Sequence, residues 1–393
     1  EGESAEAVPP AVEDGAPPVS QAVSMENFVE TTYFLDPDEA EHLFHEAEAE
    51  WRRDVRGAVL DALFDRVEDV EVRDRHAEIL RMLGQLLPAF LGRGDLRNAT
   101  KIVVEVGGLL EGTELSGEER EEAERLLRDL NEPQVLNQFL GSLEDGTIDP
   151  SIPDLERFLA YLGAEALPLL LRASERSESA RLREKLAGAL GELAGKHAKA
   201  LVDLIGAPDD RVALAAALQA GRLQLHPAGG ALVAMYRKGD VAARRRAIES
   251  LASISDADSL EAVQEALRDE DREVRVVAAR GLGAMRNPAS LAALRSAVKA
   301  RALRDADLTE QIAFFEAFGA VALEEDITLL DRLLNGRRLL GKQSPETRAC
   351  AAMALGAVAT PMARQALLKA AEDQQPIVRN AVSKSLARMS RPS

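Results

Sequence analysis

The sequence predicts an all-α fold, an α-solenoid of stacked antiparallel helix pairs preceded by an irregular helical region. The first observation is an arginine that recurs in one register, with a leucine seven residues after each copy. The second is composition: 46% of the residues are hydrophobic but only 4% are aromatic, and the apolar residues are mostly Ala, Leu and Val, which suit closely packed helices. The recurring arginines are Arg183, Arg211, Arg244, Arg275, Arg348 and Arg379.

The spacing of these arginines indicates a structural repeat. Successive gaps are 28, 33, 31, 73 and 31 residues, and the gap of 73 is a double step because Gln311 and Phe318 fill the missing arginine and leucine positions. A period of about 30 to 37 residues on a helical pattern is typical of helical repeats. We expect the arginine to be structural, bonded to carbonyls or an aspartate of the loops between repeats, rather than one of a row of ligand-binding groups. Arg275 and Arg379 each follow an aspartate by six residues.

The first part of the chain is predicted to hold a tail and then irregular helices. Residues 1–24 are rich in Pro, Ala and Glu and have no apolar period, so we expect a disordered acidic tail or linker. Residues 25–145 are the irregular helical region. Apolar patterns there predict helices over residues 38–65, 71–92 and 95–111.

Local signals mark where helices of this region begin and end. The run Gly92-Arg93-Gly94-Asp95 predicts a break between two helices. Ser116, with Glu119 three residues later, predicts a capping box that opens the next helix. Pro133 predicts the first turn of a further helix.

Residues 146–393 are predicted to form the regular array. A cap at Ser151 opens it, and each unit then reads as helix, turn, helix, turn. The clearest unit runs over residues 271–299, where apolar residues recur at helical spacing until Asn287-Pro288 ends the first helix and caps the second. His226-Pro227 and Thr360-Pro361 stand at the corresponding turns. Such pairs bury their apolar faces only by stacking on their neighbours.

Two segments carry a resemblance to a known family. They read DREVRVVAARGLGAMRNPASLAALRSAVK and SPETRACAAMALGAVATPMARQALLKAAED. The first carries a VR…A…LG core, the second the same core with Thr347 in place of the valine, and both have a proline in the turn between helices. This pattern resembles the HEAT-repeat family, in its short bacterial form related to phycobilisome-lyase repeats, over about residues 150–393. Residues 300–345 depart from the pattern, because three phenylalanines replace small residues and residues 335–343 look like an inserted loop.

The resemblance implies a binding surface, because the second helix of each pair lines the concave face in HEAT-like solenoids. Several basic residues lie off the apolar stripe there or in the inserted loop, and we expect them to accept an acidic peptide or protein. Glu261, Glu265 and Asp331 on the same helices reduce the local positive charge. The expected partner-binding residues are Arg295, Lys299, Arg332, Arg337, Arg338, Lys342, Arg364 and Lys369.

The distribution of charge narrows the range of partners. The formal net charge of −19 divides into −22 over residues 1–200 and +3 over residues 201–393. An acidic front half repels nucleic acid and anionic membranes, so we expect a protein partner and no nucleic acid. No apolar run is long enough to predict a membrane span. A single cysteine excludes an intrachain disulfide and fits a reducing, cytoplasmic compartment.

Few residues suggest chemistry. His42 and His45, flanked by Glu41 and Glu46, form the one histidine cluster, but the order H-x-x-H-E matches no zinc-protease motif and predicts a solvated helix surface. Cys350 falls in an apolar stripe and is expected to be a buried core thiol. We therefore predict no catalytic site, no metal and no cofactor.

The preferred hypothesis is a non-catalytic scaffold or adaptor that binds a partner on its concave face. One alternative is a lyase-like or chromophore-handling factor, which rests on analogy of fold alone. Another is a nucleic-acid-binding helical-repeat protein, although the sole tryptophan, Trp51, lies outside the array. A further possibility is that the acidic residues 1–50 dock in the C-terminal groove of the same chain.

Overall fold

The computed structural model describes residues 41–47, 54–69, 75–112, 115–336 and 343–390. The chain divides into two compact units, residues 1–59 and residues 60–393. None of the described residues lies in a β-strand, and most lie in helices. The tail predicted over residues 1–24 falls outside the described residues, and the boundary predicted at residues 145/146 stays a prediction.

The irregular region contains one correction. Residues 41–47 are helical, and α2 (Val55–Glu68) begins after Asp54, which is itself not helical and whose carboxylate accepts a hydrogen bond from the Gly57 N–H. The prediction of one helix over residues 38–65 is therefore wrong, because Asp54 starts a new helix there.

The other signals in this region predicted the helices well. The later helices are α3 (His76–Gly92), α4 (Leu96–Glu111), α5 (Gly117–Leu130) and α6 (Pro133–Glu144). Gly94 takes a positive φ of 76° at the predicted break, and Asp95 caps α4. The capping box of Ser116 and Glu119 is confirmed, as is Pro133 in the first turn of α6.

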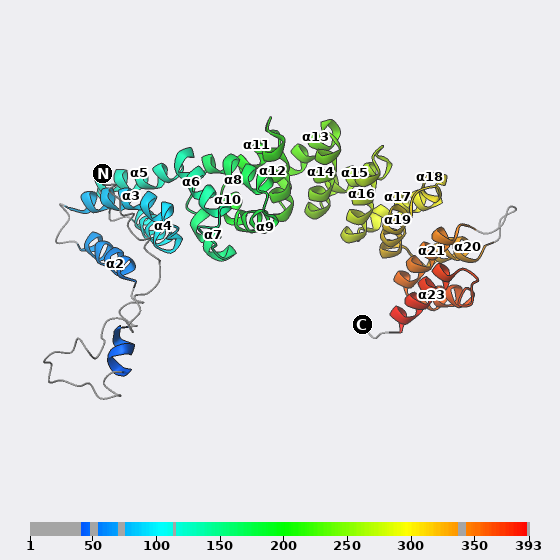
Figure 1. The fold of residues 1–393 in the computed structure, drawn as a ribbon. Helices are drawn as coiled ribbons and strands as arrows, with labels where there is room; N and C mark the ends of the chain where they lie inside the picture. Colours follow the sequence, from blue (N-terminus) through cyan, green and yellow to red (C-terminus); the bar gives the residue numbers. More distant parts are fainter. Residues whose placement is uncertain (1–40, 48–53, 70–74, 113–114, 337–342, 391–393) are drawn as a thin grey trace, which may run out of the picture. The chain divides into compact units, whose positions relative to one another are not determined.

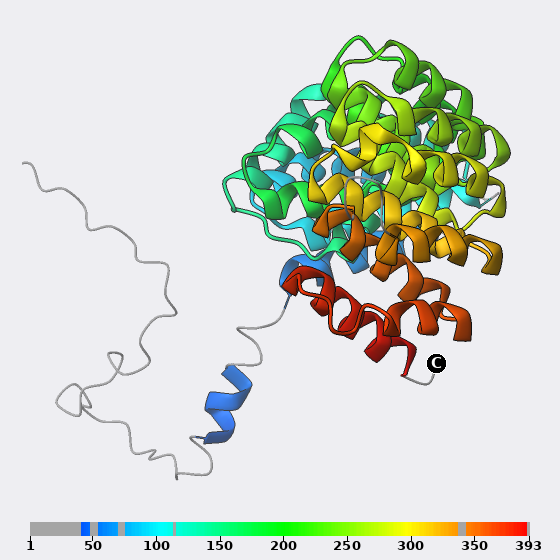
Figure 2. The same ribbon diagram turned by 90° about the vertical axis from the view of Figure 1, so that its right-hand side faces the viewer.

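The array follows, and from α12 on longer helices alternate with shorter ones (Figure 1, Figure 2). Its first helices are α7 (Ile152–Leu159), η4 (Ala164–Ala166), α8 (Leu167–Arg176), α9 (Ala180–Ala189), α10 (Gly191–Lys196) and α11 (Ala198–Leu204). From α12 on, one helix of each repeat carries the repeat arginine or Gln311, and we call these helices the first row. They are α12 (Asp210–Arg222), α14 (Val241–Ile254), α16 (Arg272–Met285), α19 (Leu308–Val321), α21 (Pro345–Val358) and α23 (Pro376–Met389).

The helices between them are called the second row. They are α13 (Gly229–Lys238), α15 (Ala257–Glu265), α17 (Leu291–Lys299), α20 (Ile327–Asn335) and α22 (Pro361–Leu368). Short elements join the rows: η5 (His226–Ala228), η6 (Ala266–Arg268), η7 (Pro288–Ser290), α18 (Arg301–Arg304) and η8 (Glu324–Asp326). The predicted turns at Asn287-Pro288, His226-Pro227 and Thr360-Pro361 are confirmed, and the predicted α-solenoid of stacked antiparallel pairs is the observed fold.

First-row helices pack on one another at backbone distance. A Cβ placed on Gly319 of α19 would lie 2.9 Å from the Ala354 Cα of α21. Ser250 and Ser385 use the same closeness, since each hydroxyl donates to a carbonyl of the preceding first-row helix, at 2.7 and 3.0 Å. Second-row helices contact one another less. One apolar core runs from Leu60 to Val382 between the rows.

We predict that Gly319→Ala destabilises the array. The new methyl group meets backbone atoms of α21 that cannot move aside, so we expect a loss of about 1–3 kcal/mol in the free energy of unfolding, measured by urea titration. Gly141→Ala is the matched control, because nothing lies within 4 Å of that Cβ and alanine favours a helix interior by about 0.5–1 kcal/mol. Equal effects of the two substitutions would show that the first row is not closely packed.

Candidate partner-binding site

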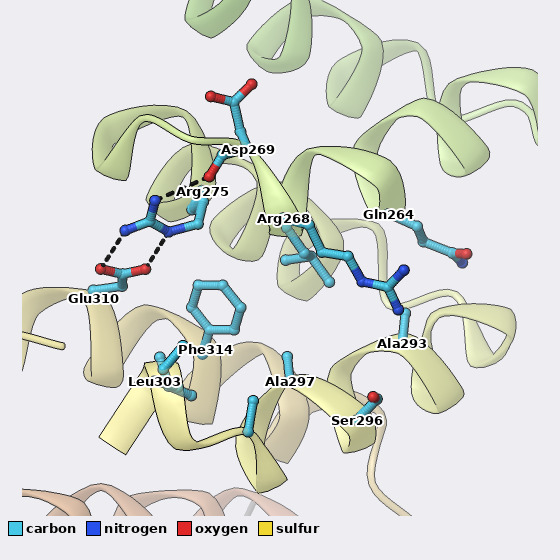
Figure 3. Close-up of a pocket in the computed structure, with 13 residues that line it drawn as sticks. Gln264, Arg268, Asp269, Arg275, Ala293, Ser296, Ala297, Leu303, Glu310 and Phe314 are labelled. Carbon is cyan, nitrogen blue, oxygen red and sulfur yellow. Dashed lines mark hydrogen bonds and ion pairs between the residues drawn. The ribbon is translucent and has the colours of Figure 1, made fainter. Parts of the chain in front are cut away.

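Three of the six repeat arginines, Arg183, Arg275 and Arg379, contact the loop that precedes their own helix. Arg275 donates to the Asp269 carbonyl at 2.9 Å (Figure 3) and to the Glu270 carbonyl at 2.9 Å. Arg379 makes the same pair of bonds to the carbonyls five and six residues before it, at 3.0 and 2.6 Å. Arg183 also donates to the carbonyls five and six residues earlier. These bonds satisfy carbonyls in the turn that no helix pairs.

A second set of bonds joins one repeat to the next. Arg244 donates to the Asp269 carboxylate at 3.1 Å, so Asp269 receives Arg244 on its side chain and Arg275 on its carbonyl. Asp373 is bonded in the same way by Arg348 on its side chain and by Arg379 on its carbonyl. The aspartate six residues before an arginine therefore pairs with the arginine of the preceding repeat.

Gln311 fills the arginine position with a different set of bonds. Its amide N–H donates to the Ala306 carbonyl at 2.8 Å, and its amide oxygen accepts from the Thr347 hydroxyl at 2.9 Å. Arg275 of the preceding repeat pairs instead with Glu310, at 2.6 and 3.0 Å. A neutral side chain thus keeps both links, within the repeat and between repeats. Arg211 lies exposed at the start of α12.

The predicted partner-binding residues lie along the second row and differ in their surroundings. Arg295 on α17 is ion-paired with Asp326 at 2.6 Å, and Lys369 just after α22 with Asp331 at 2.8 Å. Three others are exposed and form no ion pair with any described residue: Lys299, Arg332 and Arg364. Arg337, Arg338 and Lys342 lie outside the described residues.

How closely the helices of each row approach one another indicates which row faces the inside of the curve. In a curved stack of two rows, the helices of the inner row approach one another more closely. The backbone contacts at Gly283, Gly319 and Gly356 lie in the first row, so the packing favours the first row as the inner one rather than the second row implied by the resemblance. The second-row residues remain candidates for partner binding, but on a surface other than the concave one.

A pocket of about 450 Å³ opens between α15, η6, α16, α17, α18 and α19 (Figure 3). Its apolar lining includes Leu267, Ala293, Ala297, Leu303 and Phe314. Its polar lining includes Gln264, Arg268, Ser296, Arg275 and Glu310. Helix α18 forms one wall, and the connection that holds it is longer than the two residues between α13 and α14.

Some of the charged side chains around this pocket are paired with an opposite charge, and one is not. Arg275 and Glu310 neutralise one another, and the Asp269 carboxylate is bonded to Arg244. Arg268 is exposed, and no described residue forms an ion pair with it; Figure 3 shows its side chain reaching over the pocket toward Ala293. The pocket therefore has an apolar interior and a positive charge at its mouth. Sequence reasoning did not find this pocket, although the extra residues between α17 and α19 were a usable signal.

The histidines and the cysteine considered for metal binding or catalysis do not line this pocket. His42 lies 3.4 Å from Glu46 on an exposed helix surface. Among the described residues no group of three or more His, Cys, Asp or Glu side chains is placed to hold a metal ion. Cys350 is fully buried, and burial raises the pKa of its thiol to about 12, so the thiol stays protonated at neutral pH. No helix of the described residues is long and apolar enough to cross a membrane.

This geometry is that of an α-solenoid built from helical repeats. The family model for HEAT repeats matches residues 230–313 and 336–393, and these residues are HEAT repeats, as the sequence pattern indicated. The match begins after the start of the expected range of about 150–393. No curated protein matches the chain.

The chain is similar at a low level to several solved structures. The complex of CpcE and CpcF of phycocyanin lyase from Nostoc sp. PCC7120 is 19% identical, with 48% of this chain and 74% of that chain covered and a TM-score of 0.33. An engineered protein is 19% identical, with coverage of 84% and 99% and a TM-score of 0.35. The karyopherin Kap121p bound to the extreme C-terminus of the protein phosphatase Cdc14p is 15% identical, with coverage of 82% and 40% and a TM-score of 0.39. Similarity at this level says nothing about activity.

We predict that Arg348→Met is strongly destabilising. Arg348 and Asp373 are both buried, so removing the guanidinium leaves an unpaired carboxylate in the interior, at a cost of about 3–5 kcal/mol. Arg348→Met with Asp373→Asn should be less destabilised than the single variant, because the charge is gone and the Asn oxygen still accepts from the Gln375 N–H. Chemical denaturation of wild type, the two single variants and the double variant measures the coupling. A single variant within about 1 kcal/mol of wild type would contradict the link between repeats.

We predict that Tyr236, which lies beside the linked pair Arg244 and Asp269, ionises only at high pH. Burial and the charge of the Asp269 carboxylate raise the pKa of Tyr236 to about 12 from the ordinary value of 10.0. The stability this gives is complete below pH 10 and is lost as the pH rises from 10 to about 12. In the variant Tyr33→Phe/Tyr161→Phe, ultraviolet absorbance should show little tyrosinate at pH 11 while circular dichroism still shows the helices. Half-ionisation near pH 10 in the folded protein would refute the burial of this phenol.

Proposed function

We propose that the chain is a non-catalytic scaffold that binds an acidic segment of a partner protein along the second row. The observation that carries this proposal is a set of exposed cations that form no ion pair with any described residue, Lys299, Arg332 and Arg364, on the successive second-row helices α17, α20 and α22. Repeat arrays present long surfaces on which each unit adds one contact to an extended partner. The other two predicted partner-binding residues that the structure describes, Arg295 and Lys369, are already compensated by acids.

The charge balance of the array supports an acidic partner. Each exposed cation is worth little alone, because solvent and salt screen it. Several cations along one surface act together, and they attract a negatively charged segment and raise its association rate. The acidic residues Glu261 and Glu265 lie on α15, one helix before these cations, so we expect the segment to lie from α17 toward α22.

The chemistry of the described residues supports a scaffold over an enzyme. Cys350, the one thiol, is buried, and burial together with the charges of Glu316 and Glu346 raises its pKa, which disfavours the thiolate that a nucleophile needs. A buried free thiol also fits a reducing compartment, and we propose a cytoplasmic location. No particular contact favours the lyase-like or nucleic-acid-binding alternatives.

We predict that Lys299→Glu/Arg332→Glu/Arg364→Glu abolishes partner capture. The tagged chain would be used to recover proteins from its source cells, and each recovered protein would then be purified and titrated calorimetrically. Reversal of three charges should weaken binding at least about tenfold, and raising the salt concentration should weaken wild-type binding. The matched control is Arg97→Glu/Arg157→Glu/Lys199→Glu, which makes the same change of net charge on exposed residues of α4, α7 and α11.

Two results would contradict the proposal. One is that the wild-type chain recovers no protein that binds it when purified. The other is a partner whose affinity is the same for the triple variant and for wild type, which would place binding on another surface.

A further inference from the structure

We propose that the pocket between α15 and α19 takes a single large apolar side chain of an acidic peptide, with a carboxylate close to that side chain bound by Arg268. This inference rests on the proposed function and deepens it, because it names the residue pattern that the array recognises. The charges along the second row attract the segment, and the pocket fixes its position along the array.

The size and lining of the pocket fit a side chain. A volume of about 450 Å³ lies within the usual range of binding pockets, about 300–1,000 Å³. Leu267, Leu303 and Phe314 supply apolar surface, while Ala293 and Ala297 on α17 leave the space open. One aromatic or long aliphatic side chain buried in such a pocket commonly dominates the binding energy of a peptide.

The charge at the mouth selects the neighbour of that side chain. The acids near the pocket are engaged, since Glu310 is bonded to Arg275, and Asp269 to Arg244. Arg268 has no ion pair with any described residue, so a peptide carboxylate would meet an uncompensated guanidinium. A basic peptide would place like charges together. The charge around the pocket therefore complements an acidic segment.

The wall formed by α18 is held in place without a ligand. The Arg304 guanidinium donates to the Lys299 carbonyl at 2.8 Å, and Arg301 is ion-paired with Asp305 at 3.3 Å. Buried Leu303 anchors the same short helix in the core. Since these contacts already order the wall, binding costs little further ordering. Gln264 donates its amide to the Ala289 carbonyl at 3.2 Å and keeps its oxygen to accept from a peptide N–H.

Selection from a random peptide library tests this inference. Peptides of about twelve residues, displayed on phage, would be selected on the immobilised full chain, and the enriched peptides would be measured by fluorescence anisotropy. We expect an aromatic or long aliphatic residue within a few positions of Asp or Glu. Ala297→Trp should weaken binding at least about tenfold by filling the pocket. Ala292→Trp, on the exposed side of the same helix, should leave the affinity unchanged.

A second variant separates charge from shape. Arg268→Glu should weaken binding of the selected peptides and should favour peptides in which the acid is replaced by Lys. The inference fails if no apolar–acidic pattern is enriched, or if the selected peptides bind Ala297→Trp as tightly as wild type. It also fails if Ala297→Trp abolishes self-association of the chain, since the occupant is then a second copy.

The outcomes distinguish this inference from the proposed function. If peptides lose affinity for the triple variant Lys299→Glu/Arg332→Glu/Arg364→Glu but not for Ala297→Trp, the second row binds partners and the pocket inference is wrong. If the affinity falls for Ala297→Trp alone, the pocket inference holds and binding along the second row is wrong.

Discussion

The stacking of the repeats depends on arginines that bond either turn carbonyls without a helical partner, as Arg275 and Arg379 do, or the aspartate of the next turn, as Arg244 and Arg348 do. Asp269 and Asp373 show the full arrangement, because each receives one arginine on its side chain and the next on its carbonyl. The same contact therefore closes a turn and ties two repeats together. Bonds of this kind accumulate along a stack, because each repeat touches only its neighbours.

This arrangement separates the residues that build the array from those that are free to bind. Except for the exposed Arg211, the repeat arginines bond loops between helices, where their charge is used within the chain. The first row closes at backbone distance, through glycine at positions such as Gly319 and Gly356. The second row is packed less closely and carries exposed cations, so it has both the space and the charge for a partner.

The sequence predicted the fold class and most helices, because caps, prolines and apolar spacing act locally. It failed at Asp54, where a residue read as helix interior starts a helix. It predicted the period but not which acid meets which arginine, since the partner of Arg244 lies 25 residues away and is set by stacking. The pocket escaped prediction for a similar reason, because its lining comes from six separate elements. The pairing of Arg295 with Asp326 likewise became visible only in three dimensions.

The central claim is that the second row is the binding surface and the first row is structural. Hydrogen–deuterium exchange of the full chain, with and without a partner that binds it, tests this claim most directly. We expect the partner to slow exchange in α17, α18, α20 and α22, and to leave α14, α21 and α23 unchanged. Slower exchange confined to the first row, or to helices before α12, would contradict it.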